Sequence, residues 1–124
     1  MNVSRGFLIL GAVWILVGVP IGLYMGPTAD YTLVPLHAHI NLVGFVLSTL
    51  FGLVYNAKSA MAENILGRAH FWLHLVGGLV MIPALYLLLS NNMTEQAAGP
   101  FLEGGGGLIL LGLIAYLVNL LRNG

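Results

Sequence analysis

The chain has 124 residues, of which 59% are hydrophobic and only 6% are charged, a composition that excludes an ordinary soluble domain. Its formal net charge is zero, so it lacks the basic surface that neutralises nucleic-acid phosphates, and nucleic acid is not an expected partner. It contains no cysteine, which excludes disulfides, thiolate metal sites and covalent haem attachment. The mean hydropathy of +0.96 therefore predicts an integral membrane protein.

Four apolar segments follow one another along the chain, separated by turn-forming or polar residues. The first follows Arg5 as the core of a secretory signal would, but no small-residue cleavage site follows it, so we expect a retained helix. The second begins just after Pro35, a residue that the first turn of a helix tolerates. The sequence predicts one all-α transmembrane domain over 1–124, a bundle of four helices with spans of about 6–25, 36–55, 69–89 and 102–121.

The charged residues divide between the two sides of the membrane that these spans imply. All four cationic side chains fall on one side, whereas Asp30 and Glu95 fall on the other. By the positive-inside rule the side with the cations is cytoplasmic, so we expect both termini in the cytoplasm and the protein in a bacterial inner membrane. The four cations are Arg5, Lys58, Arg68 and Arg122.

All four histidines lie inside the predicted spans, where a polar side chain is costly and is therefore a candidate functional residue. His37 and His39 lie at the outer end of the second span, whereas His70 and His74 lie at the inner end of the third. Because a helix rises about 1.5 Å per residue, we expect the two pairs to be well separated in depth and to form separate sites.

His37 and His39 are predicted to face opposite ways. At about 100° per residue they point roughly 160° apart, so one regular helix cannot bring both to a single metal ion. The His37 face continues as a stripe of small, weakly polar residues, which lets a flat cofactor or another backbone approach closely, and the His39 face continues as an apolar stripe. The small stripe is Asn41, Gly44, Ser48 and Gly52, and the apolar stripe is Leu42, Val43, Val46, Leu50 and Leu53.

Both histidine pairs also have a purely structural interpretation. A histidine near the membrane interface can hydrogen-bond a backbone carbonyl or a water, and the small stripe can be ordinary helix packing. His70 and His74 share one helix face, which suits zinc or copper as well as hydrogen bonds to a neighbouring helix. Because no carboxylate or third histidine is near them in the sequence, packing is favoured for this pair. The run Gly104 to Gly107 is expected to permit close helix contact.

Two histidine-containing segments together resemble a known family. A His-x-His motif opens the second span, and a basic residue followed by His-Phe-Trp-Leu opens the third. In order and membrane orientation this is similar to the tenth and eleventh helices of the haem-copper oxidase and nitric oxide reductase catalytic subunit. The residues that carry the resemblance are Leu36-His37-Ala38-His39, Asn41, Gly44 and Phe51-Gly52, then Arg68-Ala69-His70-Phe71-Trp72-Leu73, Gly77 and Pro83.

The resemblance implies haem ligation by the second span. In that family the two histidines of the motif face two different haems, and His37 and His39 match those positions, whereas the counterpart of His70 is not a haem ligand. The family subunit has twelve helices in three similar arcs of four, so three copies of this chain would rebuild such a ring. The copper-site histidines, the crosslinked tyrosine and the arginines that meet haem propionates have no counterpart here.

The leading hypothesis is a homotrimeric haem b protein with iron at each subunit interface, held by His37 of one chain and His39 of its neighbour. Asn41 and Gly44 are expected to line the cofactor. Two imidazole ligands favour electron transfer, or redox or gas sensing, with a quinol or a periplasmic carrier as partner, and an enzyme is not the favoured interpretation.

Three alternatives stay open. In an enzyme variant, one histidine alone holds the iron and leaves a position for oxygen or nitric oxide. In a second alternative, a haem-free module binds a respiratory complex through Gly44, Ser48 and Gly52. In a third, a copper-binding protein uses His37 and His39 across an interface.

Overall fold

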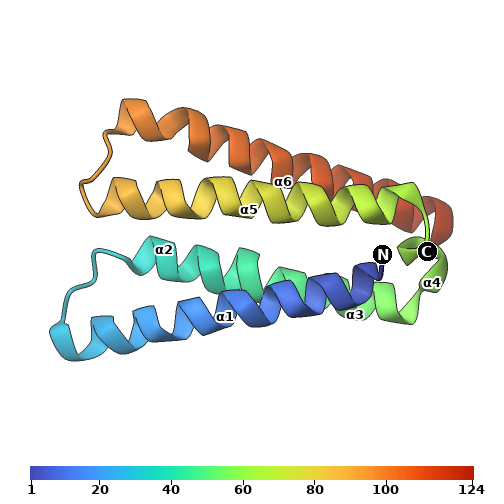
Figure 1. Ribbon diagram of the computed structural model, residues 1–124, viewed down its shortest axis with the longest axis horizontal. Coiled ribbons are helices and arrows are strands. Elements are labelled where there is room, and N and C mark those ends of the chain that lie inside the picture. Colours follow the sequence, from blue (N-terminus) through green and yellow to red (C-terminus); the bar gives the residue numbers. More distant parts are fainter.

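Four long helices make up the structure, a computed structural model that describes all 124 residues and contains no strands (Figure 1). Each is long and apolar enough to cross a membrane, which confirms the prediction of an all-helical chain with four helices of membrane-spanning length and composition. The second span consists of three consecutive helical segments. The elements are α1 (Val3–Thr28), α2 (Val34–His39), η1 (Ile40–Val46), α3 (Leu47–Ala57), α4 (Ser59–Ala62), α5 (Ile65–Leu89) and α6 (Glu95–Asn123).

Three helices begin earlier than the apolar pattern predicts, because polar side chains cap them outside the hydrophobic segments. Asn2 caps α1 and Asn64 caps α5 by accepting backbone N–H groups of the first turn. Thr94 caps α6 in the same way, so α6 begins at Glu95 rather than near residue 102. Each cap satisfies donors that the start of a helix leaves free.

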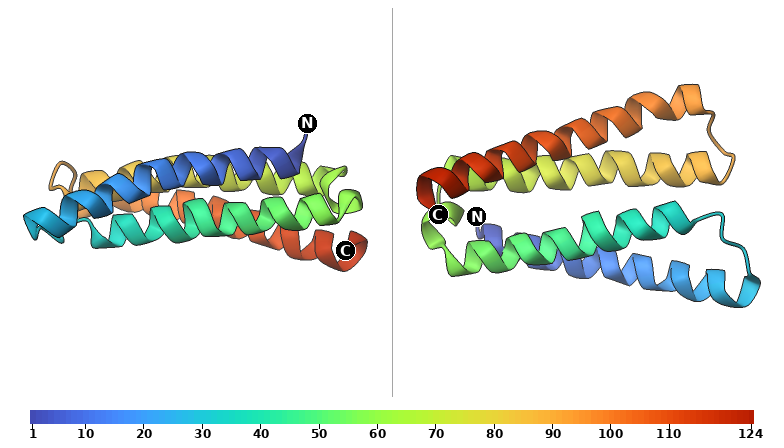
Figure 2. Two further views of the ribbon diagram at one scale, coloured as in Figure 1. Left: turned by 90° about the horizontal axis from the view of Figure 1, so that it is seen from below. Right: turned by 180° about the vertical axis from the view of Figure 1, so that it is seen from behind.

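The helices form two antiparallel hairpins, one from α1 and span 2 (Val34–Ala57), the other from α5 and α6 (Figures 1 and 2). The short helix α4 joins the hairpins at the end of the bundle that also holds both chain termini. We call this the terminal end and the opposite one the loop end. Toward the loop end, α1 and α6 spread apart with α2 and α5 between them (Figure 1).

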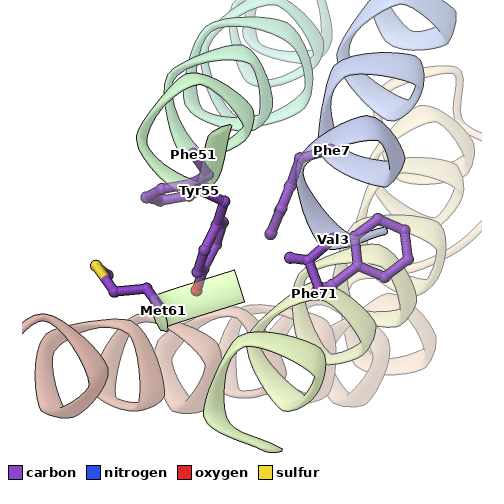
Figure 3. Close-up of a cluster of buried hydrophobic side chains, with 6 residues drawn as sticks. All are labelled: Val3, Phe7, Phe51, Tyr55, Met61 and Phe71. Atoms are coloured by element: carbon purple, nitrogen blue, oxygen red, sulfur yellow. The ribbon is translucent and has the colours of Figure 1, made fainter. Parts of the chain in front are cut away.

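The terminal end holds the largest hydrophobic core, in which side chains from α1, α3, α4 and α5 point toward one another (Figure 3). Phe7 lies at its centre. Its ring stacks on Tyr55 with centroids 5.7 Å apart and meets Phe71 edge-on at 5.1 Å. The buried members are Val3, Phe7, Phe51, Tyr55, Met61 and Phe71.

A smaller core joins the two hairpins nearer the loop end. Leu36 and Ile40 of span 2 are buried there against Ile82 of α5. Many other large apolar side chains remain exposed on the chain, as expected for surfaces that face lipid or another subunit.

Helices α5 and α6 approach each other closely at a pair of glycines. A Cβ atom on Gly77 would lie 2.7 Å from the carbonyl oxygen of Gly105, and a Cβ atom on Gly105 would lie 2.7 Å from that of Gly77. The close contact expected from the glycine run therefore falls on Gly105 alone, because Gly104, Gly106 and Gly107 have no neighbour within 4 Å of the Cβ position. Small residues let helix backbones approach in this way.

Candidate functional site

Span 2 is not a regular α-helix, which corrects a premise of the sequence analysis. The segment Ile40–Val46, directly after His39, is a π-helix, and the N–H of Leu47 that follows it donates to Leu42 instead of to Val43. A π-helical turn holds one more residue than an α-helical turn, and such turns are frequent at functional sites. The irregularity therefore lies immediately beside the predicted ligand pair.

His37 lies between span 2 and α1. Its Nδ1 is 2.9 Å from the carbonyl oxygen of Gly18, and its Nε2 is 3.2 Å from the amide nitrogen of Asn41. Because a carbonyl only accepts and an amide nitrogen only donates, Nδ1 carries the proton and Nε2 presents its lone pair. Glycine at position 22 makes room for the ring, since a Cβ atom there would lie 2.9 Å from Cε1 of His37. The imidazole is half-buried.

His39 is exposed on the outside of the chain. Its Nδ1 is 2.7 Å from the carbonyl oxygen of Pro35, one turn earlier, so Nδ1 donates and Nε2 again presents a lone pair. Leu42, Leu50 and Leu53 of the same span are each more than half exposed. His39 is thus a polar side chain on a largely apolar outer surface, a costly arrangement unless something outside the chain contacts it.

The small stripe of span 2 contacts α1 of the same chain. A Cβ atom on Gly44 would lie 2.6 Å from Cγ of Trp14, and Gly52 also packs against α1. The Oδ1 of Asn41 is buried against Gly18 and has no hydrogen-bond partner. The close approach that the stripe permits is therefore made by α1. Asn41 borders the His37 ring from inside the chain, whereas Gly44 packs against Trp14.

His70 and His74 are buried among aromatic side chains of the terminal half. The Nδ1 of His70 is 2.8 Å from the hydroxyl of Tyr55. The Nε2 of His74 is 3.1 Å from the carbonyl oxygen of Val43 and 3.2 Å from the hydroxyl of Ser48. No third His, Asp or Glu joins the pair. These contacts are interhelical hydrogen bonds, the packing role that the sequence favours for both residues.

The two histidine pairs are closer in depth than the sequence predicts. His74 reaches the carbonyl of Val43, which follows His39 by four residues, or about 6 Å of helix. The sequence estimate treated α5 as beginning near residue 69, whereas Asn64 caps it at Ile65 and so shifts His74 further from the terminal end. A single hydrogen bond therefore separates His74 from the turn that follows the candidate ligands.

Two polar side chains that the sequence did not single out, Tyr55 and Asn119, are completely buried. Tyr55 bonds His70, and Asn119 accepts from the amide of Asn64 at 2.9 Å and donates to the carbonyl of Met61 at 2.8 Å. A signal existed for Asn119, because it is the only amide side chain in the fourth predicted span, a pattern that indicates an interhelical hydrogen bond.

Comparisons with family models, with curated proteins and with solved structures find no match for this chain. A function is therefore inferred from the geometry of the histidines and of the residues that orient them.

Proposed function

We propose that this chain is the subunit of a membrane haem b protein in which His37 of one copy and His39 of a neighbouring copy hold one iron. The observation that carries the proposal is the state of His39, which is exposed on a membrane-spanning helix with Nδ1 bonded to Pro35 and Nε2 free. An imidazole in this state leaves its ligand nitrogen available to a partner outside the chain.

Both histidines fit the role of an axial ligand. Histidines that bind metals generally donate their second ring N–H to a carbonyl or carboxylate, which fixes the tautomer and the orientation of the ring. His37 donates to Gly18 and His39 donates to Pro35, so both Nε2 atoms have the lone pair that iron requires. The amide of Asn41, now 3.2 Å from the Nε2 of His37, would release that nitrogen to the iron.

A second copy of the chain is needed because one copy cannot complete the site. His37 faces α1 and His39 faces away from the chain, and no three His, Asp or Glu side chains converge anywhere in the structure. In the proposed closed ring, the exposed His39 of one copy lies against the neighbouring copy where His37 is partly buried between span 2 and α1. We propose three copies, as the resemblance to a ring of three four-helix arcs implies.

His37 and His39 would hold the haem iron through two neutral imidazoles, a ligand set that suits electron transfer better than gas binding. The chain itself orients the two rings through the carbonyls of Gly18 and Pro35, and the neighbouring residues Leu36 and Ile40 of span 2 are buried in the smaller core. By the positive-inside rule we expect the loop end on the periplasmic side of a bacterial inner membrane. We therefore propose a quinol or a periplasmic carrier as the electron partner.

The first experiment is a visible spectrum of the protein purified in detergent after expression with ample haem. We expect a Soret band and, on reduction with dithionite, the sharp α-band of low-spin haem b. His37→Ala and His39→Ala should each lose the low-spin spectrum, whereas the control Leu110→Ala, at an exposed position of α6, should keep it. A wild-type protein without a Soret band would overturn the proposal and favour the haem-free module, or the copper protein if metal analysis finds copper.

A second experiment tests whether the two ligands come from different copies. When the His37→Ala and His39→Ala chains are co-expressed, each mixed ring contains one interface with both histidines intact. Random mixing of equal amounts should therefore restore about one quarter of the wild-type haem content. If both ligands came from the same chain, mixing would restore none.

A further inference from the structure

The side chain of His74 in α5 hydrogen-bonds the backbone of the π-helical segment of span 2. Its Nε2 is 3.1 Å from the carbonyl oxygen of Val43, and because a carbonyl only accepts, this nitrogen carries the proton. In an α-helix that carbonyl would receive the N–H of Leu47, which here donates to Leu42. The bond from His74 therefore goes to a carbonyl that has lost its α-helical donor.

The burial of His74 indicates that this bond determines how the ring is placed. The side chain is 3% exposed, and its Nδ1 is buried without any partner, which is an unfavourable state for a polar atom. The rings of Phe7 and Phe51 lie beside it, each with its centroid 5.7 Å away. The imidazole is thus packed beside two aromatic rings, and its single N–H, on Nε2, is directed at Val43 and Ser48.

The π-helical turn determines which way the preceding segment faces. One extra residue in a turn rotates everything before it by about 100° relative to everything after it. Residues Leu47–Ala57 are anchored in the terminal half by Phe51 and Tyr55, so the rotation is expressed in α2. α2 carries His37, His39 and the buried Leu36.

We infer that His74 is a positioning residue, whose hydrogen bond to Val43 holds the π-helical turn and thereby sets the directions of His37 and His39. The inference rests on the proposed function for its consequence at the haem, but the rotation of α2 can be measured without haem. Without the bond, the segment relaxes toward a regular helix. Leu36 then leaves the core beside Ile82, and His37 loses its alignment with the carbonyl of Gly18.

A matched pair of variants isolates the bond. The amide nitrogen of glutamine can occupy the place of Nε2, whereas asparagine is too short to reach the carbonyl, so His74→Gln should keep the turn and His74→Asn should lose it. His74→Leu removes all polar atoms, and Ser48→Ala removes the other neighbour of Nε2 while leaving the bond to Val43 intact. Size exclusion and circular dichroism identify which variants are folded.

The haem-independent measurement uses the absence of cysteine from the chain. A single Leu36→Cys thiol, buried at a position that is 2% exposed, reports rotation of α2 through its rate of reaction with a maleimide. We expect the rate to rise about tenfold in His74→Asn and His74→Leu but not in His74→Gln or Ser48→Ala. Val34→Cys, already exposed, is the control that should react rapidly in every background.

The spectroscopic measurement is the low-spin EPR signal of the oxidised haem, which depends on the relative orientation of the two imidazole planes. We expect His74→Asn to shift this EPR signal and His74→Gln to keep the wild-type signal. Unchanged Leu36→Cys labelling in folded His74→Asn would overturn the inference. If labelling changes as expected but the wild type binds no haem, the proposed function fails while the positioning of α2 by His74 stands.

Discussion

At the terminal end of the bundle, side chains from four elements enclose Phe7 and Tyr55, whereas toward the loop end α1 and α6 spread apart and His39 is exposed (Figures 1 and 3). Both regions contain a pair of intramembrane histidines. At the terminal end the chain itself supplies hydrogen-bond partners for His70 and His74. At the loop end it supplies partners for both Nδ1 atoms but leaves the Nε2 of His39 free.

The difference shows that the presence of histidines in a span does not distinguish a packing role from a ligand role. The distinguishing feature is whether a partner outside the chain can reach the free ring nitrogen. The unpartnered nitrogens of His70 and His74 are buried inside the chain, which suits packing, whereas the free Nε2 of His39 belongs to an exposed ring oriented by a carbonyl. The following predictions test whether the terminal half is complete within one chain.

The largest effect is expected at the contact between α5 and α6. Gly77→Ala places a Cβ atom 2.7 Å from the backbone oxygen of Gly105, and the helices must separate, so we expect a loss of about 2 kcal/mol in the free energy of unfolding. The free energy of unfolding is measured by titration with sodium dodecyl sulfate, with circular dichroism as the readout. Gly106→Ala, with no neighbour within 4 Å, is the control. Equal stabilities for the two variants would contradict the close contact.

A smaller effect is expected from Tyr55→Phe. The change removes the hydroxyl 2.8 Å from the Nδ1 of His70, whose Nε2 already lacks a partner, so the buried ring is left without any hydrogen bond. We expect a loss of about 1 to 2 kcal/mol in the same unfolding assay. Tyr86→Phe, half-exposed on α5 with no hydroxyl bond, should change nothing. The haem spectrum should persist in both variants, because the terminal half does not supply ligands.

The smallest effect is expected in the loop between α1 and α2. The hydroxyl and backbone N–H of Thr32 both donate to Asp30, and these bonds hold the pKa of the Asp30 carboxyl below its ordinary value. The contribution to stability is therefore present at neutral pH and is lost as the pH falls through the lowered pKa. Thr32→Ala should raise the pKa of Asp30, measured by carbon NMR titration. An unchanged pKa would show that the loop differs from the structure.

Much of the fold was predictable from the sequence because a membrane restricts the choices. Hydrophobic length alone located four spans, and helical periodicity alone placed His37 and His39 on different faces, as the structure has them. The starts of the helices were less predictable. Caps such as Asn64 and Thr94 extend α5 and α6 into polar sequence that hydropathy assigns to loops.

The shape of span 2 was not predictable from local sequence. Nothing in Ile40–Val46 distinguishes a π-helix from an α-helix by composition, since the segment contains no proline and only one glycine. The π-helical turn instead coincides with a hydrogen bond to Val43 from His74, which lies 31 residues away in the sequence. Periodicity assumes a regular helix, so it cannot anticipate a turn that depends on another helix.

Both chain termini lie at the same end of the bundle, a direct result of the even number of spans. Copies of the chain can therefore be joined head to tail by short linkers without an added crossing of the membrane. Such a fused chain would let each His37 and each His39 be replaced separately. Duplication and fusion of the gene would therefore give a longer chain whose repeats keep the same orientation in the membrane.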